Sequence, residues 1–169
     1  MRAGKWNARM PLLISDSNIF IDLIEGDLLQ LMFRLPEIFA VPNILFQEEL
    51  VNHYPDLPVY GLQVMDIDGA YMSEAHRLRR LYKGPSQNDL FALVLAKQEK
   101  CPLITGDLRL RKAAKKEGLV IRGTVWIVKR LLEEKLITLT RAKDAFEGMK
   151  QAGSRLPWDE VEAMLNEFR

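Results

Sequence analysis

Four acidic residues in this chain lie at positions where their side chains could converge. Asp16 and Asp107 each follow directly on an apolar run of strand length, Glu49 lies within a predicted helix, and Asp89 lies near the start of a long apolar helix. Mg²⁺ and Mn²⁺ prefer oxygen ligands. Converging carboxylates repel one another unless a cation or protons offset the crowded charge. The four residues are therefore candidate ligands of a divalent cation.

Each position also has a purely structural explanation. Asp16 and Asp107 stand where a helix begins, and Asp is a favoured N-cap residue. Ser86 and Asp89 have the spacing of a capping box, in which the acidic side chain reaches back to the cap. Glu49 is equally consistent with a solvated helix position, and its neighbour Glu48 is an alternative site residue.

Strand-length apolar runs alternate with helical patterns along the chain. Pro36, Pro42, Gly84 and Pro85 mark breaks between them. The predicted strands are Pro11–Ser15, Ile38–Val41, Val64–Ile67, Pro102–Thr105 and Leu119–Ile121. The predicted helices are residues 16–24, 27–35, 42–53, 69–82, 87–100, 108–117, 125–134 and 158–168, with residues 55–58 as a loop.

This alternation predicts an α/β fold with a parallel sheet covered by helices on both faces. In open sheets of this kind, functional residues gather beyond the carboxyl ends of the strands. Asp16 and Asp107 both follow strands, so we expect them to project from the same edge of the sheet.

Composition restricts the class of protein more than it identifies a partner. The 169 residues are 48% hydrophobic and 28% charged, as in an ordinary globular domain. No apolar run approaches the roughly 20 residues of a membrane span, and the stretch around Trp6 lacks the apolar core of a signal peptide. The single Cys101 favours a reducing cytoplasm. The net charge of +1 means that any RNA-binding surface must come from local clustering.

The order of these motifs resembles the PIN domain, most closely the VapC-like toxins of toxin–antitoxin pairs and related prokaryotic proteins. The motifs are Asp-x-Asn at Asp16, Glu-Leu at Glu49, Asp89 at a helix start, and Thr-x-Asp ending at Asp107. The resemblance covers roughly residues 12–137, and the stretches 123–128 and 134–137 are similar to the tail of one branch of the family.

The resemblance implies a Rossmann-like three-layer fold and a metal-dependent ribonuclease. By match of motif, Asp16, Glu49, Asp89 and Asp107 would bind Mg²⁺ or Mn²⁺ and carry the hydrolysis of RNA, with Asn18 and Thr105 as supporting polar groups. It also implies an antitoxin protein as a partner and a homodimer. We expect a PIN domain over residues 1–139 and a helical extension over residues 140–169 that packs on this domain or on a partner.

Two basic helices flank the acidic positions. The first carries Arg79, Arg80 and Lys83 just before Asp89, and the second carries Arg109 and Arg111 just after Asp107. Cations beside a carboxylate cluster would neutralise phosphates and fix the RNA strand. The alternative explanation is that both are solvated helix faces.

Two other functions are weighed against the nuclease. A haloacid-dehalogenase-type phosphatase also places an Asp after its first strand, but it needs a second Asp two residues later, where this chain has Asn18. A PIN-like fold that binds nucleic acid or protein without catalysis is the stronger alternative, because fold alone does not establish activity.

Overall fold

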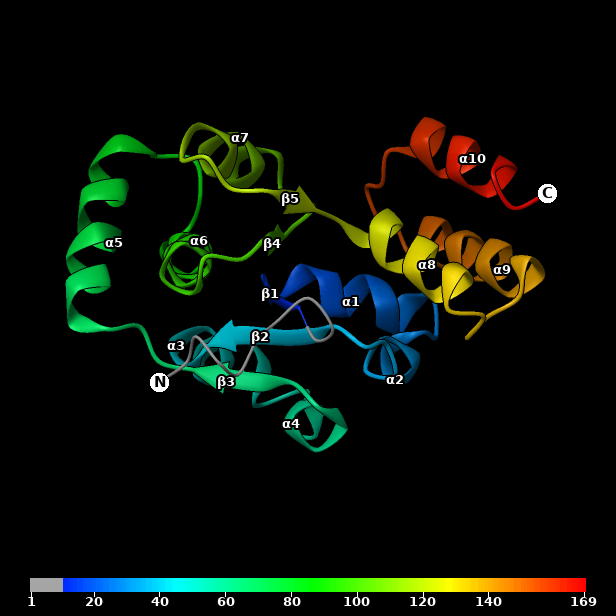
Figure 1. Ribbon diagram of the computed structural model, residues 1–169, viewed down its shortest axis with the longest axis horizontal. Helices are drawn as coiled ribbons and strands as arrows, with labels where there is room; N and C mark the ends of the chain where they lie inside the picture. Colours follow the sequence, from blue (N-terminus) through cyan, green and yellow to red (C-terminus); the bar gives the residue numbers. More distant parts are fainter. Residues whose placement is uncertain (1–10) are drawn as a thin grey trace.

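The computed structural model describes residues 11–169. The basic N-terminal stretch around Trp6 lies outside the described residues. Five short strands form one parallel sheet in the order β3-β2-β1-β4-β5 (Figure 1). The strands are β1 (Leu12–Ser15), β2 (Ile38–Pro42), β3 (Gln63–Met65), β4 (Leu103–Ile104) and β5 (Ile121–Arg122).

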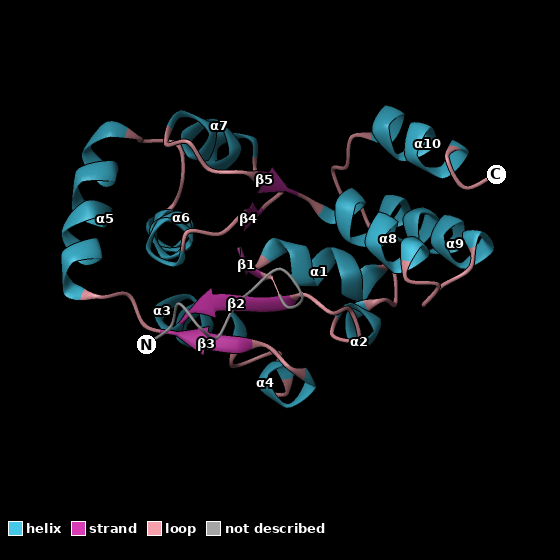
Figure 2. Ribbon diagram, in the orientation of Figure 1, coloured by secondary structure: helices cyan, strands magenta, loops and turns pink. Residues whose placement is uncertain are grey.

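Helices connect all the strands, as a parallel sheet requires (Figure 2). Before β4 they are α1 (Asn18–Glu25), α2 (Leu29–Met32), α3 (Asn43–Leu45), the π-helical turn η1 (Phe46–Leu50), α4 (Leu57–Tyr60), α5 (Gly69–Leu81) and α6 (Gln87–Glu99). After β4 they are α7 (Leu108–Lys116), α8 (Thr124–Glu133), α9 (Leu139–Gln151) and α10 (Trp158–Asn166).

The helices form layers on the two sides of the sheet (Figure 1). Helix α6 packs across β1, β2 and β4, and α5 packs on the outside of α6. Every residue from Leu90 to Ala96 is buried, which explains why this helix is apolar on all sides. Helix α1 buries Ile19, Phe20 and Leu23 and packs against α2, α8 and α9. The predicted three-layer α/β architecture is confirmed.

The strand register brings the candidate residues to one edge. Strand β1 lies between β2 and β4, with Ile14 opposite both Ala40 and Leu103. The amide of Asp16 donates to the carbonyl of Ile104 at 3.2 Å, so the pairing of β1 with β4 extends to the first residue of the site. The carboxyl ends of these central strands therefore carry Asp16 and the turn that leads to Asp107.

Three predicted elements differ from the observed ones. The helix predicted over residues 42–53 is instead α3 followed by the π-helical turn η1, which ends at Leu50. The helix predicted over residues 27–35 is only α2, because Asp27 adopts a left-handed conformation (φ 56°) and Leu28 closes the end of α1 by donating to Leu23 at 2.7 Å. The segment predicted as a loop, residues 55–58, overlaps the start of α4, which has Pro58 in its first turn. Proline is tolerated there because that position needs no N–H donor.

The C-terminal helices pack on the rest of the chain. Helix α9 crosses α1 closely. A side chain at Gly148 in α9, or at Gly26 just after α1, would come too close to atoms of the other helix. Asp22 of α1 accepts hydrogen bonds from Thr124 at the start of α8 (2.8 Å) and from Ser154 after α9 (2.9 Å). Helix α10, predicted as amphipathic, buries Val161, Met164 and Leu165 and contacts α8. No helix within residues 11–169 has the length and apolar character of a membrane span.

Candidate active site

Asp16 is the buried centre of the site. It lies directly after β1 with only 1% of its surface exposed. Its Oδ2 accepts a short hydrogen bond from the hydroxyl of Thr105, and its Oδ1 accepts from the amide of Ile19 at 3.3 Å. The second bond lies in the first turn of α1, so Asp16 also helps to begin that helix. Two adjacent strand ends thus position the carboxylate from both sides.

The surroundings of Asp16 hold the pKa of its carboxyl at about 7, well above the ordinary value of 3.8. Burial is the largest cause, because removal from water disfavours the charged form. The charges of Asp89 and Asp107 raise the pKa further, while the hydrogen bonds from Thr105 and Ile19 oppose the rise. Three of the four predicted carboxylates therefore act on one another electrostatically.

Thr105 links the two strand-end aspartates. Its hydroxyl donates to Asp16 and accepts from the amide of Asp107 at 3.0 Å. Asp107 is in turn the N-cap of α7, where its Oδ1 accepts from the amide of Leu110 at 2.8 Å. The hydroxyl of Thr105 thus holds Asp107 in register with Asp16.

Asp89 caps the helix on which it lies. The amide of Asp89 donates to Ser86 Oγ at 3.0 Å, and Asp89 Oδ2 accepts from the amide of Ser86 at 2.9 Å. This is a complete capping box, so the structural explanation holds for Asp89 as it does for Asp107. Capping does not remove Asp89 from the site, because its charge is still felt at Asp16.

Both adjacent glutamates make contacts at the site. Ser17 Oγ donates to Glu49 Oε1 at 3.1 Å, which joins Glu49 to the turn after β1. Asn88 Nδ2 donates to Glu48 Oε2 at 2.9 Å, which joins Glu48 to the residue before Asp89. Sequence reasoning chose between the two glutamates, whereas the structure gives each one a partner. Sequence reasoning did not single out Ser17 or Asn88. The one indication of a role for them was that they are adjacent in sequence to Asp16 and Asp89.

The π-helical turn η1 explains how neighbouring residues serve two elements. The amide of Val51 donates to the carbonyl of Phe46 at 2.8 Å, five residues back, in place of the usual four. This wider turn rotates successive side chains by a smaller angle than an α-helix does. Glu48 and Glu49 therefore diverge less around the helix axis, and both reach toward the edge that carries Asp16.

The donor set matches a hard divalent cation in chemistry. The oxygens are carboxylates and hydroxyls, which are the kind of ligand that such a cation prefers. Within residues 11–169, no three His, Cys, Asp or Glu side chains are already close enough together to hold a metal ion. Asn18, the exposed first residue of α1, lies next to Ser17.

The basic residues divide into two groups. Arg79 donates to the carbonyls of Pro85 (2.7 Å) and Lys83 (3.2 Å), and Arg111 donates to those of Thr105 (2.7 Å) and Arg122 (3.4 Å). Both guanidinium groups therefore hold loops in place. The prediction of RNA contacts is carried forward only for the other three residues, which are exposed: Arg80, Lys83 and Arg109.

Arg109 is held close to the loop between α5 and α6. Gly84 lies beneath its side chain, so that a Cβ added at Gly84 would come within 2.8 Å of Arg109 Cδ. Lys83 precedes this glycine. Lys83 and Arg109 therefore border the loop that leads into Asp89, with Asp107 adjacent in sequence to the helix that carries Arg109.

Two solved structures are similar to this chain. The structure of VapBC2 from Rickettsia felis, bound to a DNA fragment from its promoter, has 15% sequence identity and a TM-score of 0.49, with 66% of this chain and 98% of that chain covered. The structure of PAE2754 from Pyrobaculum aerophilum has 13% identity and a TM-score of 0.51, with 73% of this chain and 91% of that chain covered. A search of curated proteins finds no match.

The sequence itself matches a protein family over nearly its whole length. That family, DUF3368, is described as a PIN domain, and the match covers residues 12–169. It includes every strand of the sheet and the C-terminal helices α9 and α10. The chain therefore belongs to the PIN-domain family, as its motifs predicted.

Proposed function

We propose that this protein is a metal-dependent ribonuclease that hydrolyses phosphodiester bonds of RNA. The observation that carries the proposal is the placement of buried Asp16 at the carboxyl edge of the sheet, where the hydroxyl of Thr105 joins it to Asp107. An aspartate that only caps a helix does not need to be buried to this extent. Carboxylates brought together at an energetic cost are typical of sites that bind a cation or perform acid–base chemistry.

In this proposal Asp16, Glu49, Asp89 and Asp107 would hold Mg²⁺ or Mn²⁺. Such an ion lowers the pKa of a bound water and stabilises the negative charge that develops on the phosphate. Thr105 favours the ionised form of Asp16 through its hydrogen bond. Arg80, Lys83 and Arg109 would bind phosphates on either side of the cleaved bond and fix the strand in register.

We also propose the toxin role, in which the protein acts in the cytoplasm and is inhibited by an antitoxin that covers the acidic edge. The single cysteine supports a reducing compartment. Cys101 is half-buried, and burial raises the pKa of its thiol to about 12, which keeps the thiol protonated and unreactive. Growth arrest on expression of the wild type, absent with Asp16→Asn, would support this role. Growth at the same rate with both would contradict it.

The direct test is cleavage of a mixed RNA pool by purified protein with Mn²⁺, with Mg²⁺ and with EDTA. Asp16→Asn is the matched control because Asn keeps the size and can still accept from the amide of Ile19. We expect discrete products that require metal and disappear in the variant. Products that survive both EDTA and Asp16→Asn would contradict the proposal.

A second candidate is a PIN-fold module that binds RNA or protein without cleaving. It is favoured by one observation: no trio of metal-ligating side chains is already assembled in the part of the chain that the structure describes. Two measurements separate the candidates: calorimetry measures the binding of Mn²⁺, and the cleavage assay measures hydrolysis of RNA. Turnover favours the nuclease, and RNA binding with no product under any metal favours the module.

A further inference from the structure

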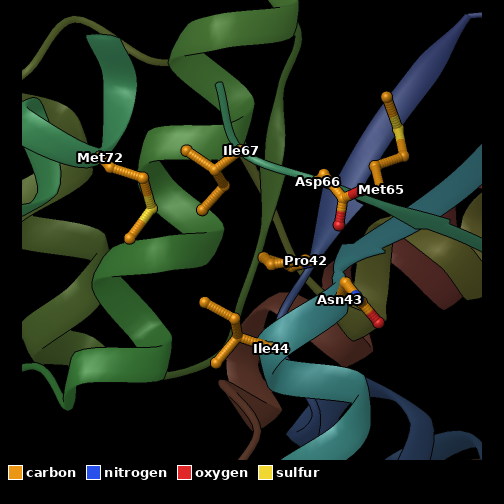
Figure 3. A pocket seen from close by; sticks show the side chains of 7 residues that line it. All are labelled: Pro42, Asn43, Ile44, Met65, Asp66, Ile67 and Met72. Atoms are coloured by element: carbon orange, nitrogen blue, oxygen red, sulfur yellow. The ribbon is translucent and has the colours of Figure 1, made fainter. Parts of the chain in front are cut away.

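A small cavity lies beside the acidic site, at the carboxyl ends of β2 and β3. It has a volume of about 190 Å³ and is lined by Pro42, Asn43, Ile44, Met65, Asp66, Ile67 and Met72. Figure 3 shows the aliphatic side chains of Ile44, Ile67 and Met72 on one side of Pro42, and the polar groups of Asn43 and Asp66 on the other. None of these residues is needed for the chemistry proposed above.

The strand register fixes how far the cavity lies from Asp16. Continuing the pairing of Ile14 with Ala40 sets Asp16 level with Pro42, and Pro42 is paired with Met65. Neighbouring strands are about 4.8 Å apart. The backbone at the cavity is therefore one to two strand spacings from Asp16, about 5–10 Å. A strand of RNA cut at Asp16 would place one of its nearest nucleotides here.

We propose that this cavity binds one nucleobase of the RNA substrate, within two nucleotides of the cleaved bond, and selects a base that carries an amino group. The inference rests on the proposed nuclease function and specifies its substrate. Pockets for drug-sized ligands measure roughly 300–1,000 Å³, so a cavity of this size suits a single planar ring system.

The lining has the chemistry of a base site. Aliphatic and thioether groups from Ile44, Ile67 and Met72 offer an apolar surface to the face of a base. Single-stranded RNA is recognised by such contacts together with hydrogen bonds to base edges. The carboxylate of Asp66 repels phosphate and accepts from amino N–H groups. The single N–H on the pairing edge of uracil lies between two carbonyl oxygens that a carboxylate repels, so Asp66 favours adenine, cytosine or guanine over uracil.

The polar wall of the cavity is held in place by neighbouring elements. Gln98 of α6 donates to the carbonyl of Asp66 at 3.3 Å and accepts from the amide of Asp68 at 2.7 Å, which ties the loop after β3 to α6. Gln47 Nε2 donates to Asn43 Oδ1 at 3.4 Å, which restrains the Asn43 amide. The backbone of the loop that carries Asp66 is thus fixed before any RNA binds.

The test measures base preference with and without cleavage. Short RNAs that differ at one position are cleaved by the otherwise wild-type protein, and their binding to the Asp16→Asn protein is followed by fluorescence anisotropy. At one position within two nucleotides of the cut, we expect amino-bearing bases to be favoured over uracil about tenfold. Asp66→Asn and Asn43→Ala should reduce this preference to about twofold or less. The control Asp56→Asn removes the same charge from exposed α4 and should preserve it.

The outcomes separate the two proposals. If the wild type neither cleaves nor binds RNA, the proposed function fails and this inference fails with it. If RNA is cleaved, or only bound, with a base preference that Asp66→Asn and Asn43→Ala leave unchanged, only the inference is overturned. If these variants instead convert a dimer to a monomer in sedimentation while the base preference persists, the cavity is an interface with a second copy of the chain, which also overturns it.

Discussion

Asp16 carries an electrostatic cost that the fold must offset. Its carboxyl has a pKa of about 7 in the folded chain, against an ordinary value of 3.8. Between these two values the unfolded chain is ionised at this position while the folded chain retains the proton. Stability attributable to Asp16 is therefore fully present below about pH 4, falls as the pH rises to about 7, and remains low above that.

Asp16→Asn should stabilise the metal-free protein in a pH-dependent way. Asn removes the ionisation, so the gain should be small near pH 4 and should reach up to about 4 kcal/mol above pH 7. Urea denaturation in EDTA at pH 4.5 and pH 8 measures the difference, with Asp56→Asn as the exposed control. An equal change in stability at the two pH values would contradict the prediction.

At the scale of elements, the π-helical turn η1 is the unusual feature of the site. It presents adjacent Glu48 and Glu49 to two other elements, the turn after β1 and the first turn of α6. We propose that Glu48 positions Asp89 through its hydrogen bond from Asn88. Outer groups that orient metal ligands are often important to activity although they touch no metal.

Glu48→Ala should lower metal-dependent RNA cleavage about tenfold and change stability by less than about 1 kcal/mol, because the lost hydrogen bond is exposed. Glu48→Gln retains an acceptor for Asn88 and should restore most of the activity. Asn88→Ala should resemble Glu48→Ala, and the double variant should be no worse than either. Additive losses in kcat would contradict this coupling.

The elements that the sequence predicts best are those whose apolar residues are buried in the core. Strands β1 and β2 are continuous apolar runs, and α6 is apolar over the stretch Leu90–Ala96 that the structure buries. Placement of Asp16 and Asp107 at one sheet edge followed from parallel topology alone. These features are encoded locally, in composition and in order along the chain.

Other features depend on contacts that no local pattern records. The π-helical turn has no sequence signature, so the partners of Glu48 and Glu49 were open until the register of η1 was known. Arg79 and Arg111 were predicted to contact RNA because of their charge, yet each donates to loop carbonyls. The sequence shows which residues are cationic. It does not show which of their N–H donors are already used in hydrogen bonds within the folded chain.

On the scale of the whole molecule, a cluster of charges joins the helices on one face. Lys97 of α6 bonds Glu74 of α5 at 2.7 Å and Glu117 after α7 at 3.0 Å, and Arg77 contacts the same two carboxylates. Tyr82 donates to Glu117 at 2.6 Å. Hydrogen bonds from Arg77, then from Lys97, lower the pKa of Glu74 from 4.5 to about 2.

Lys97→Met should destabilise the protein by about 1–3 kcal/mol at neutral pH, because two half-buried carboxylates lose a shared cation. The pKa of Glu74 is depressed in the folded chain, so its stabilising effect is present above pH 4.5 and is lost as the pH falls toward 2. The penalty should shrink over that range. Thermal unfolding from pH 3 to 7 tests this, with Lys112→Met on exposed α7 as the control.

The C-terminal helices stabilise the same α1 that begins beside Asp16. A Cβ at Gly148 would lie 2.8 Å from the carbonyl oxygen of Glu25, and neither backbone can easily move. Gly148→Ala should therefore destabilise the protein by about 1–3 kcal/mol, whereas Glu147→Ala on the exposed face of α9 should change stability by less than 0.5 kcal/mol. Equal unfolding midpoints for the two variants would contradict this prediction, because they would show that α9 and α1 can move apart without a loss of stability.

The convergence of helix starts at the sheet edge has a consequence for the metal-free protein. Helices α1, α6 and α7 begin within two residues of Asp16, Asp89 and Asp107, and a helix N-terminus carries a partial positive charge from its aligned peptide dipoles. The backbone itself therefore supplies part of the counter-charge for the clustered carboxylates. This permits the chain to fold without an ion, so the metal binding proposed above would follow folding instead of driving it.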